Sequence, residues 1–143
     1  MVYYTNSAKK TEALGRKIGL TLKKGDVLAL FGQLGGGKTT FLKGVAKALK
    51  IKERIVSPTF IICRRYQVPD QAIEFCHYDW YRIENEKEVL QLGVEEELLN
   101  KNFITAIEWA EKAVNILPKK KIAVYFKYGC QEGEREIEII DNR

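Results

Sequence analysis

The sequence from Gly32 to Thr39 reads GQLGGGKT and fits the pattern G-x-x-x-x-G-K-[ST] of a phosphate-binding loop. Glycines allow backbone angles that turn successive N–H groups toward a phosphate, and a following helix adds partial positive charge at its N-terminus. Lys38 would contact the outer phosphates of a nucleotide, and the Thr39 hydroxyl would be one ligand of Mg²⁺. The segment therefore predicts a nucleotide and Mg²⁺ site; a flexible glycine turn is the alternative.

The segments on both sides of the loop have the composition that such a site requires. Residues 26–31 form a short apolar run rich in strand formers, which predicts a buried strand leading into the loop. Residues 7–22 predict a helix, with Asn6 or Ser7 as its N-cap. Thr11 on that helix either contacts a nucleotide base or is an ordinary helix residue. A helix is also predicted after the loop, where apolar residues recur at helical spacing: Phe41, Leu42, Val45, Ala46 and Leu49.

A phosphate-binding loop needs an acidic partner for Mg²⁺, usually at the end of a neighbouring strand. Glu108 follows the apolar run 103–107 and is the first choice for contacting the metal, directly or through water. Asp79 follows a predicted strand at 72–78 and is the second choice, as a further metal contact or as the residue that positions the attacking water. Lys38, Asp79 and Glu108 are thus the predicted catalytic residues. Solvated strand ends are the alternative for the two acids.

Other side chains near these acids are less informative. His77, the single histidine, would orient Asp79, sense pH or be hydrogen-bonded without a catalytic role. Residues 100–103, NKNF, match the guanine signature N-K-x-D only in the first two positions, so the base is predicted to be adenine and the nucleotide ATP. Three arginines either neutralise developing phosphate charge or are solvated surface residues: Arg64, Arg65 and Arg82.

The rest of the chain completes an α/β pattern. The other predicted elements are an antiparallel hairpin at 60–66 and 72–78, short helices at 86–92 and 94–100, and strands at 122–126 and 135–140. Residues 135–140 alternate between polar and apolar, which predicts a strand with one wet face at a sheet edge. Together the elements predict one P-loop NTPase-like domain over residues 1–143, with a mixed, mainly parallel central sheet, flanking helices and antiparallel strands.

Length and composition favour a soluble protein. With 143 residues the chain is long enough to bury its own core. No apolar stretch approaches the roughly twenty residues of a membrane span, and residues 1–6 do not begin a signal peptide, so a cytoplasmic protein without membrane contact is predicted. Three cysteines without C-x-x-C spacing indicate neither a disulfide framework nor a zinc site. A net charge of +5 allows contact with nucleic acid, but ordinary solubility explains it equally.

Four segments, in this order and spacing, resemble the bacterial TsaE (YjeE) family: GQLGGGKTT from Gly32, SPTF from Ser57, HYDWYR from His77 and IEWAE from Ile107. The resemblance covers nearly the whole chain and is more specific than the phosphate-binding loop alone. It implies a cytoplasmic ATPase, with ATP and Mg²⁺ as cofactors, that binds the TsaD–TsaB complex. This ATPase would drive threonylcarbamoyl-adenosine (t6A) modification of tRNA, with tRNA as an indirect or weak contact.

The resemblance also implies roles for individual residues. It assigns Lys38 to the phosphates, Thr39 and Glu108 to Mg²⁺, and Asp79 to hydrolysis. Residues 57–60 match a switch-like loop beside the nucleotide. Trp109 matches a residue that supports the site. The positions implied to contact the nucleotide are Thr11, Gly35, Gly36, Gly37, Lys38, Thr39, Thr40 and Arg135.

Two positions depart from the family pattern. Gln33 stands where the family usually has an acidic residue, and Ala110 replaces a proline. The sequence shows no residue that must serve as an internal arginine finger, and an arginine supplied by a partner adds a factor of about 10³ to 10⁵. Hydrolysis by the chain alone is therefore expected to be slow and to rise when the partner complex binds. A small-molecule kinase and a nucleotide-gated interaction module with incidental hydrolysis are the competing interpretations.

Overall fold

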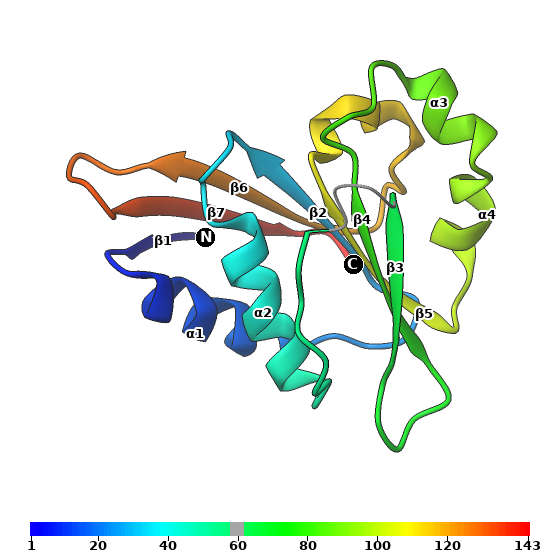
Figure 1. Cartoon of the computed structure of the whole chain (residues 1–143), viewed down its shortest axis with the longest axis horizontal. Helices are drawn as coiled ribbons and strands as arrows, with labels where there is room; N and C mark the ends of the chain where they lie inside the picture. Colours follow the sequence, from blue (N-terminus) through cyan, green and yellow to red (C-terminus); the bar gives the residue numbers. More distant parts are fainter. Residues whose placement is uncertain (58–61) are drawn as a thin grey trace.

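The computed structural model describes residues 1–57 and 62–143, which form a seven-stranded sheet in the order β1-β7-β6-β2-β5-β4-β3 (Figure 1). The inner strands β6, β2, β5 and β4 pair in parallel, whereas β1, β7 and β3 join by antiparallel pairing. The predicted mixed α/β sheet is therefore confirmed. The strands are β1 (Val2–Thr5), β2 (Val27–Gly32), β3 (Cys63–Gln67), β4 (Glu74–Asp79), β5 (Phe103–Glu108), β6 (Ile122–Tyr128) and β7 (Arg135–Asp141).

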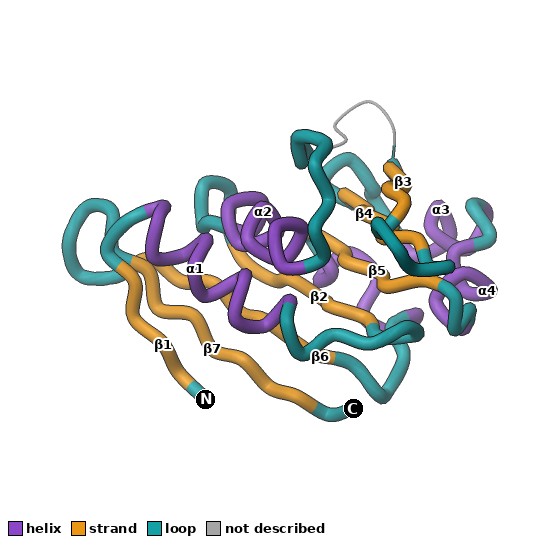
Figure 2. The backbone as a smooth tube through the Cα atoms, turned by 90° about the horizontal axis from the view of Figure 1, so that it is seen from below, coloured by secondary structure: helices purple, strands orange, loops and turns teal. Residues whose placement is uncertain are grey.

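Helices cover both faces of this sheet. They are α1 (Ala8–Gly19), α2 (Lys38–Ala48), α3 (Glu86–Gln91), α4 (Val94–Leu99) and the 3₁₀ helix η1 (Ala110–Ile116). Helices α1 and α2 lie side by side over one face, and α3 and α4 lie beside β4 and β5 (Figures 1 and 2). Helices α1 and α2 pack closely at Gly44, where a side chain has no room: a Cβ atom there would stand 1.9 Å from the carbonyl oxygen of Glu12.

The central strands are buried on both faces, which explains their continuous apolar runs. Alternate residues of one strand point to opposite faces, so Ile104, Ala106 and Glu108 share the face toward α2, and Thr105 and Ile107 share the other. The core on the α1 and α2 side contains Leu28, Leu30, Phe41, Leu42, Val45, Ile104 and Ala106. The core on the α3, α4 and η1 side contains Val27, Ala29, Cys76, Trp80, Val89 and Ile107.

One prediction about the sheet was wrong. Residues 135–140 do form a strand, but it is not an edge, because β1 pairs with β7 on its outer side. The pairing was missed because β1 has only four residues, and a partner so distant in sequence leaves no local pattern. The short helix η1 was also not predicted. The first residues of the predicted hairpin fall partly outside the described residues, and β3 is described from Cys63.

Most predicted elements agree with the structure. The N-cap of α1 is Ser7, whose Oγ accepts a hydrogen bond from the Lys10 backbone N–H at 3.2 Å. Gly93 separates α3 from α4 with a left-handed φ of 71°. Among the helices of residues 1–57 and 62–143, none combines the length and the apolar character that a bilayer span requires.

Candidate functional site

The glycine loop joins the end of β2 to the start of α2. Gly37 is the N-cap of α2 and has φ of +103°, a backbone conformation that side chains with a Cβ rarely adopt. The N–H of Gly36 donates to the carbonyl oxygen of Gln33 at 3.1 Å, which closes the turn. The first backbone N–H groups of α2 lack acceptors within the helix, so they can donate hydrogen bonds to an anion at the loop. This strand, loop and helix have the predicted order.

Lys38 lies under this loop and is only 4% exposed. Its Nζ donates to the carbonyl oxygens of Gly32 at 2.5 Å and Gln33 at 2.9 Å, and it stands 4.1 Å from the centre of the Trp109 ring. Burial lowers the pKa of the Lys38 ammonium and outweighs the opposing effect of nearby carboxylates, Glu108 first. The structure thus holds a desolvated cation at the base of the loop.

Trp109 has a left-handed backbone, with φ of 59°, which is a strained conformation for a large residue. It directly follows Glu108 at the end of β5 and begins η1. Its ring contacts the ring of Tyr81, at 5.0 Å between centroids, as well as the Lys38 ammonium. Backbone strain of this kind is typical of functional sites, and here it places an aromatic wall beside Lys38.

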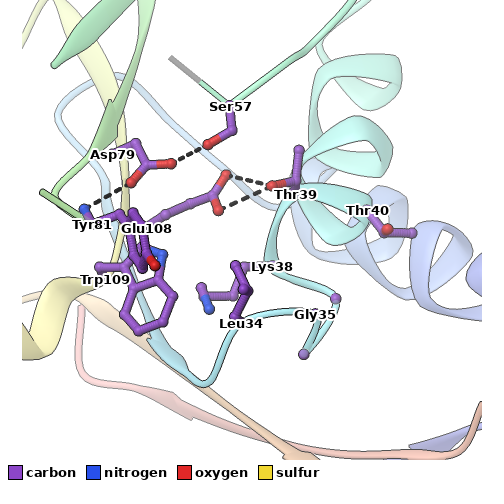
Figure 3. A pocket seen from close by; sticks show the side chains of 12 residues that line it. Leu34, Gly35, Lys38, Thr39, Thr40, Ser57, Asp79, Tyr81, Glu108 and Trp109 are labelled. Carbon is purple, nitrogen blue, oxygen red and sulfur yellow. Dashed lines mark hydrogen bonds between the residues drawn. The ribbon is translucent and has the colours of Figure 1, made fainter. Parts of the chain in front are cut away.

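Asp79 and Glu108 end two neighbouring parallel strands and pair in the register of β4 with β5. Both are buried, at 7% and 3% exposure. The Thr39 hydroxyl lies 2.9 Å from Oε1 and 3.0 Å from Oε2 of Glu108, and it donates to this carboxylate (Figure 3). The structure therefore brings together the two residues predicted as Mg²⁺ ligands, and hydroxyl and carboxylate oxygens are the donors that Mg²⁺ prefers.

Asp79 is held by two donors of its own. The Ser57 hydroxyl donates to Oδ2, and the Tyr81 backbone N–H donates to Oδ1 at 2.8 Å (Figure 3). Ser57 is the one residue of the predicted switch-like segment that the structure describes, since residues 58–60 lie outside the described ranges. Asp79 is thus a fixed hydrogen-bond acceptor facing the same space as Glu108.

These residues line one cavity of about 310 Å³. Its lining contains the loop, Lys38, both carboxylates and two aromatic side chains, and Thr40 lies beside Thr39 with its side chain directed away from the acids (Figure 3). The described lining consists of Leu34, Gly35, Gly36, Gly37, Lys38, Thr39, Thr40, Ser57, Asp79, Tyr81, Glu108 and Trp109. A cavity with a cation, two carboxylates and a row of backbone donors fits a polyphosphate with its metal ion.

Two further predicted residues lie against the loop from outside this lining. Thr11 is 3% exposed, its hydroxyl lies 2.7 Å from that of Thr5, and its Cγ2 would be 3.5 Å from a Cβ on Gly37. Arg135, at the start of β7, donates from Nη2 to the carbonyl oxygen of Gly35 at 2.9 Å. Both therefore lie beside the loop, and their contact with a nucleotide stays a prediction.

Sequence reasoning missed Tyr128, whose hydroxyl donates to the carbonyl oxygen of Leu34. The signal lies in the register, because Gly32 of β2 pairs with Phe126 of β6 and the strands run in parallel. A residue two places beyond Phe126 must then lie beside the loop. The tyrosine ring also packs against Arg135, at 4.8 Å from the guanidinium carbon to the ring centre.

The structure shows the contacts of residues for which the sequence left alternatives open. His77 contacts Glu108, at 2.8 Å between Nε2 and Oε1, rather than Asp79. Arg65 forms an ion pair with Glu97 on the far side of the sheet, and in the described structure Arg64 and Arg82 also lie outside the cavity lining. The sequence could not identify Glu108 as the partner of His77, because the register of β4 with β5 brings the two residues together from distant parts of the chain.

Replacement of Arg135 by alanine is expected to weaken binding of the predicted nucleotide, ATP, about tenfold, because the loop loses one hydrogen bond from a charged donor. Titration of the purified variant with a fluorescent ATP analogue measures the change. Lys120→Ala is the matched control, since this exposed residue in the turn before β6 carries the same charge and is not part of the cavity lining. Equal losses in both variants would attribute the effect to net charge and contradict a role of the loop contact.

Comparison with known proteins identifies the family. A family model described as "Threonylcarbamoyl adenosine biosynthesis protein TsaE" matches residues 5–137. The chain belongs to the TsaE family. It is 42% identical over 134 residues to a Nostoc protein named tRNA threonylcarbamoyladenosine biosynthesis protein TsaE, covering 92% of this chain and 80% of the relative. It is 37% identical over 133 residues to the protein of the same name from Bacillus subtilis, covering 93% and 80%.

A solved structure has the same fold. The crystal structure of Bacillus subtilis YdiB superposes with a TM-score of 0.82 at 29% sequence identity. The match covers 100% of this chain and 86% of the YdiB chain. The resemblance to the TsaE family that the sequence motifs indicated is therefore confirmed over nearly the whole chain.

Proposed function

We propose that this TsaE-family chain is a Mg²⁺-dependent ATPase that serves the biosynthesis of threonylcarbamoyladenosine in tRNA. The observation that carries the proposal is the meeting of Lys38, Thr39 and Glu108 in one cavity under a glycine loop. The names of the Nostoc and Bacillus subtilis relatives supply the pathway. The proposal includes a cytoplasmic location, where tRNA would be an indirect partner.

The residues present fit ATP and Mg²⁺. The backbone N–H groups of Gly35 to Thr40 would hold the phosphates, and Lys38 would neutralise their outer oxygens. Thr39 and Glu108 would hold Mg²⁺, because their oxygens already converge within 3.0 Å. Mg²⁺ supplies charge neutralisation on the phosphates during their transfer.

The chain's own residues then perform three tasks. The loop and Lys38 bind and orient the phosphates, and the Trp109 wall shields that contact from water. Asp79, fixed by Ser57 and Tyr81, is oriented to accept a hydrogen bond from the attacking water. Glu108 offers negative charge beside Thr39, where the metal ligand is needed. In this assignment of roles, Gln33 contributes only its backbone, whose carbonyl oxygen accepts a hydrogen bond from Lys38. This is consistent with its uncharged side chain.

A partner protein completes the proposal. Leu34 and Tyr81 border the cavity and stay 68% and 46% exposed, so the rim offers apolar surface to a second protein. The partner would be the TsaD–TsaB complex, as the family resemblance implies. A partner that covers this rim can also supply an arginine to the transferring phosphate, which accelerates hydrolysis by about 10³ to 10⁵ in other nucleotide hydrolases.

The experiment is a comparison of ATP turnover by the chain alone and with purified TsaD–TsaB of the same organism. We expect slow turnover alone and a rise of at least about tenfold with the complex, as for a partner-supplied arginine. The double substitution Leu34→Ser and Tyr81→Ser should reduce the ratio of the rate with the complex to the rate of the same variant without it. Equal turnover with and without the complex would overturn the partner-driven mechanism.

A nucleotide-gated interaction module is the second candidate, and the contact between Ser57 and Asp79 favours it, because it links the cavity to the adjoining loop. Asp79→Asn separates the two functions. If this variant stops hydrolysis but still supports repeated rounds of tRNA modification, ATP acts as a gate. If modification stops with hydrolysis, ATP turnover drives the cycle.

A further inference from the structure

His77 is wholly buried on β4 and its side chain reaches across to the next strand. In the register of β4 with β5, His77 pairs with Ala106 and Asp79 pairs with Glu108. His77 and Glu108 are therefore diagonal neighbours on the face toward α2. The distance between His77 Nε2 and Glu108 Oε1 is 2.8 Å.

The surroundings of the ring determine which nitrogen carries the proton. Glu108 accepts the Thr39 hydroxyl, and a carboxylate has only acceptor oxygens, so Nε2 must donate to it. Nδ1 is buried and has no hydrogen-bond partner within residues 1–57 and 62–143. The opposite tautomer would set a lone pair against the carboxylate and bury an N–H without an acceptor, which costs more than burying a lone pair.

We propose that His77 is a positioning residue that orients Glu108 for the metal ion of the proposed ATPase, on whose metal site this inference rests. Oε1 accepts from both His77 and Thr39, whereas Oε2 accepts from Thr39. Oε1 is thus the anchored oxygen, and Oε2 keeps the larger capacity for a metal. Groups that orient a metal ligand in this way change metal affinity by about 10- to 100-fold when they are lost.

The first test reads the tautomer directly and needs no nucleotide. The chain has one histidine, so an untagged sample with ¹⁵N-labelled histidine gives a single imidazole in a long-range ¹H–¹⁵N spectrum. We expect the pattern of a ring protonated at Nε2, with Nδ1 at the shift of an unprotonated nitrogen. A ring protonated at Nδ1 would overturn the proposal.

The second test measures how strongly Mg²⁺ improves binding of a fluorescent ATP analogue. The quantity is the ratio of the dissociation constant in EDTA to that in Mg²⁺. His77→Leu removes the donor, and the ratio is expected to fall about 10- to 100-fold while affinity in EDTA stays unchanged. His77→Gln places an amide N–H where Nε2 was and should restore most of the ratio. Thr105→Val is the control, a buried polar residue on the opposite face of β5.

The outcomes separate orientation from folding. A wild-type ratio in His77→Leu, or an equal loss of affinity in EDTA and in Mg²⁺, would overturn the proposal. If His77→Leu does not fold, the comparison of His77→Gln with His77→Asn takes its place, because the shorter asparagine amide cannot reach Glu108. Equal ratios of the dissociation constants in these two variants would overturn the proposal. If the wild-type chain binds no nucleotide, the proposed function fails, and the tautomer alone decides for or against the hydrogen bond to Glu108.

Discussion

Replacement of Glu108 by glutamine is expected to reduce Mg²⁺-dependent ATP hydrolysis by about 100-fold or more, since a metal ligand matters at least as much as the groups that orient it. Glutamine keeps the size of the side chain and an oxygen that accepts the Thr39 hydroxyl. It removes the negative charge that would hold Mg²⁺. Phosphate release measured across a series of MgCl₂ concentrations should show both a lower maximal rate and a requirement for more Mg²⁺.

Glu12→Gln is the matched control for this substitution. It removes the same charge from α1, where Glu12 forms a surface ion pair with Lys47. Such pairs contribute about 0–1 kcal/mol, so neither stability nor hydrolysis should change appreciably. A Glu108→Gln variant with the wild-type dependence on Mg²⁺ would show that the metal is held elsewhere.

Replacement of Lys38 by alanine is expected to weaken ATP binding by about 100-fold, the loss of a buried charge-assisted contact of about 3 kcal/mol. The ammonium is desolvated because Lys38 is buried, and this burial also lowers its pKa. A cation out of water attracts phosphate oxygens more strongly. Isothermal titration with ATP and Mg²⁺ measures the effect. A variant that binds ATP with wild-type affinity would contradict the assignment of Lys38 to the phosphates.

A second variant tests whether this loss reflects charge or packing. Lys38→Met removes the ammonium but keeps an unbranched side chain against the Trp109 ring. Binding should be as weak as in Lys38→Ala, with a smaller change in thermal stability. Lys47→Ala, on the exposed side of the same helix, should bind ATP normally. Recovery of affinity in Lys38→Met would indicate that packing, and not charge, governs the site.

The sequence predicted the parts of the site that depend on local order along the chain. The loop from Gly32 to Thr39 follows a buried strand and precedes a helix, and the structure has both. Glu108 was chosen because it ends an apolar run, and parallel strands bring their carboxyl ends to one edge of the sheet. The contact between Thr39 and Glu108 follows from that geometry, while their role as metal ligands stays a prediction.

Features that depend on pairing between distant segments could not be predicted. The strand β1 pairs with β7 across nearly the whole chain, and this pairing turned a predicted edge strand into an inner one. The residue that His77 contacts could not be predicted for a similar reason, since its side chain crosses to β5. The left-handed backbone of Trp109 also has no local signal, because tryptophan rarely adopts it.

The central claim is that nucleotide turnover at Lys38 and Glu108 sustains t6A formation. The most direct measurement is the amount of threonylcarbamoyladenosine in tRNA after a reconstituted reaction with limiting TsaD–TsaB, quantified by mass spectrometry of nucleosides. With the wild-type chain and ATP, modified tRNA is expected to exceed the amount of complex many times. With Lys38→Ala it should fall to the level reached without the chain. Undiminished modification with Lys38→Ala would contradict the claim.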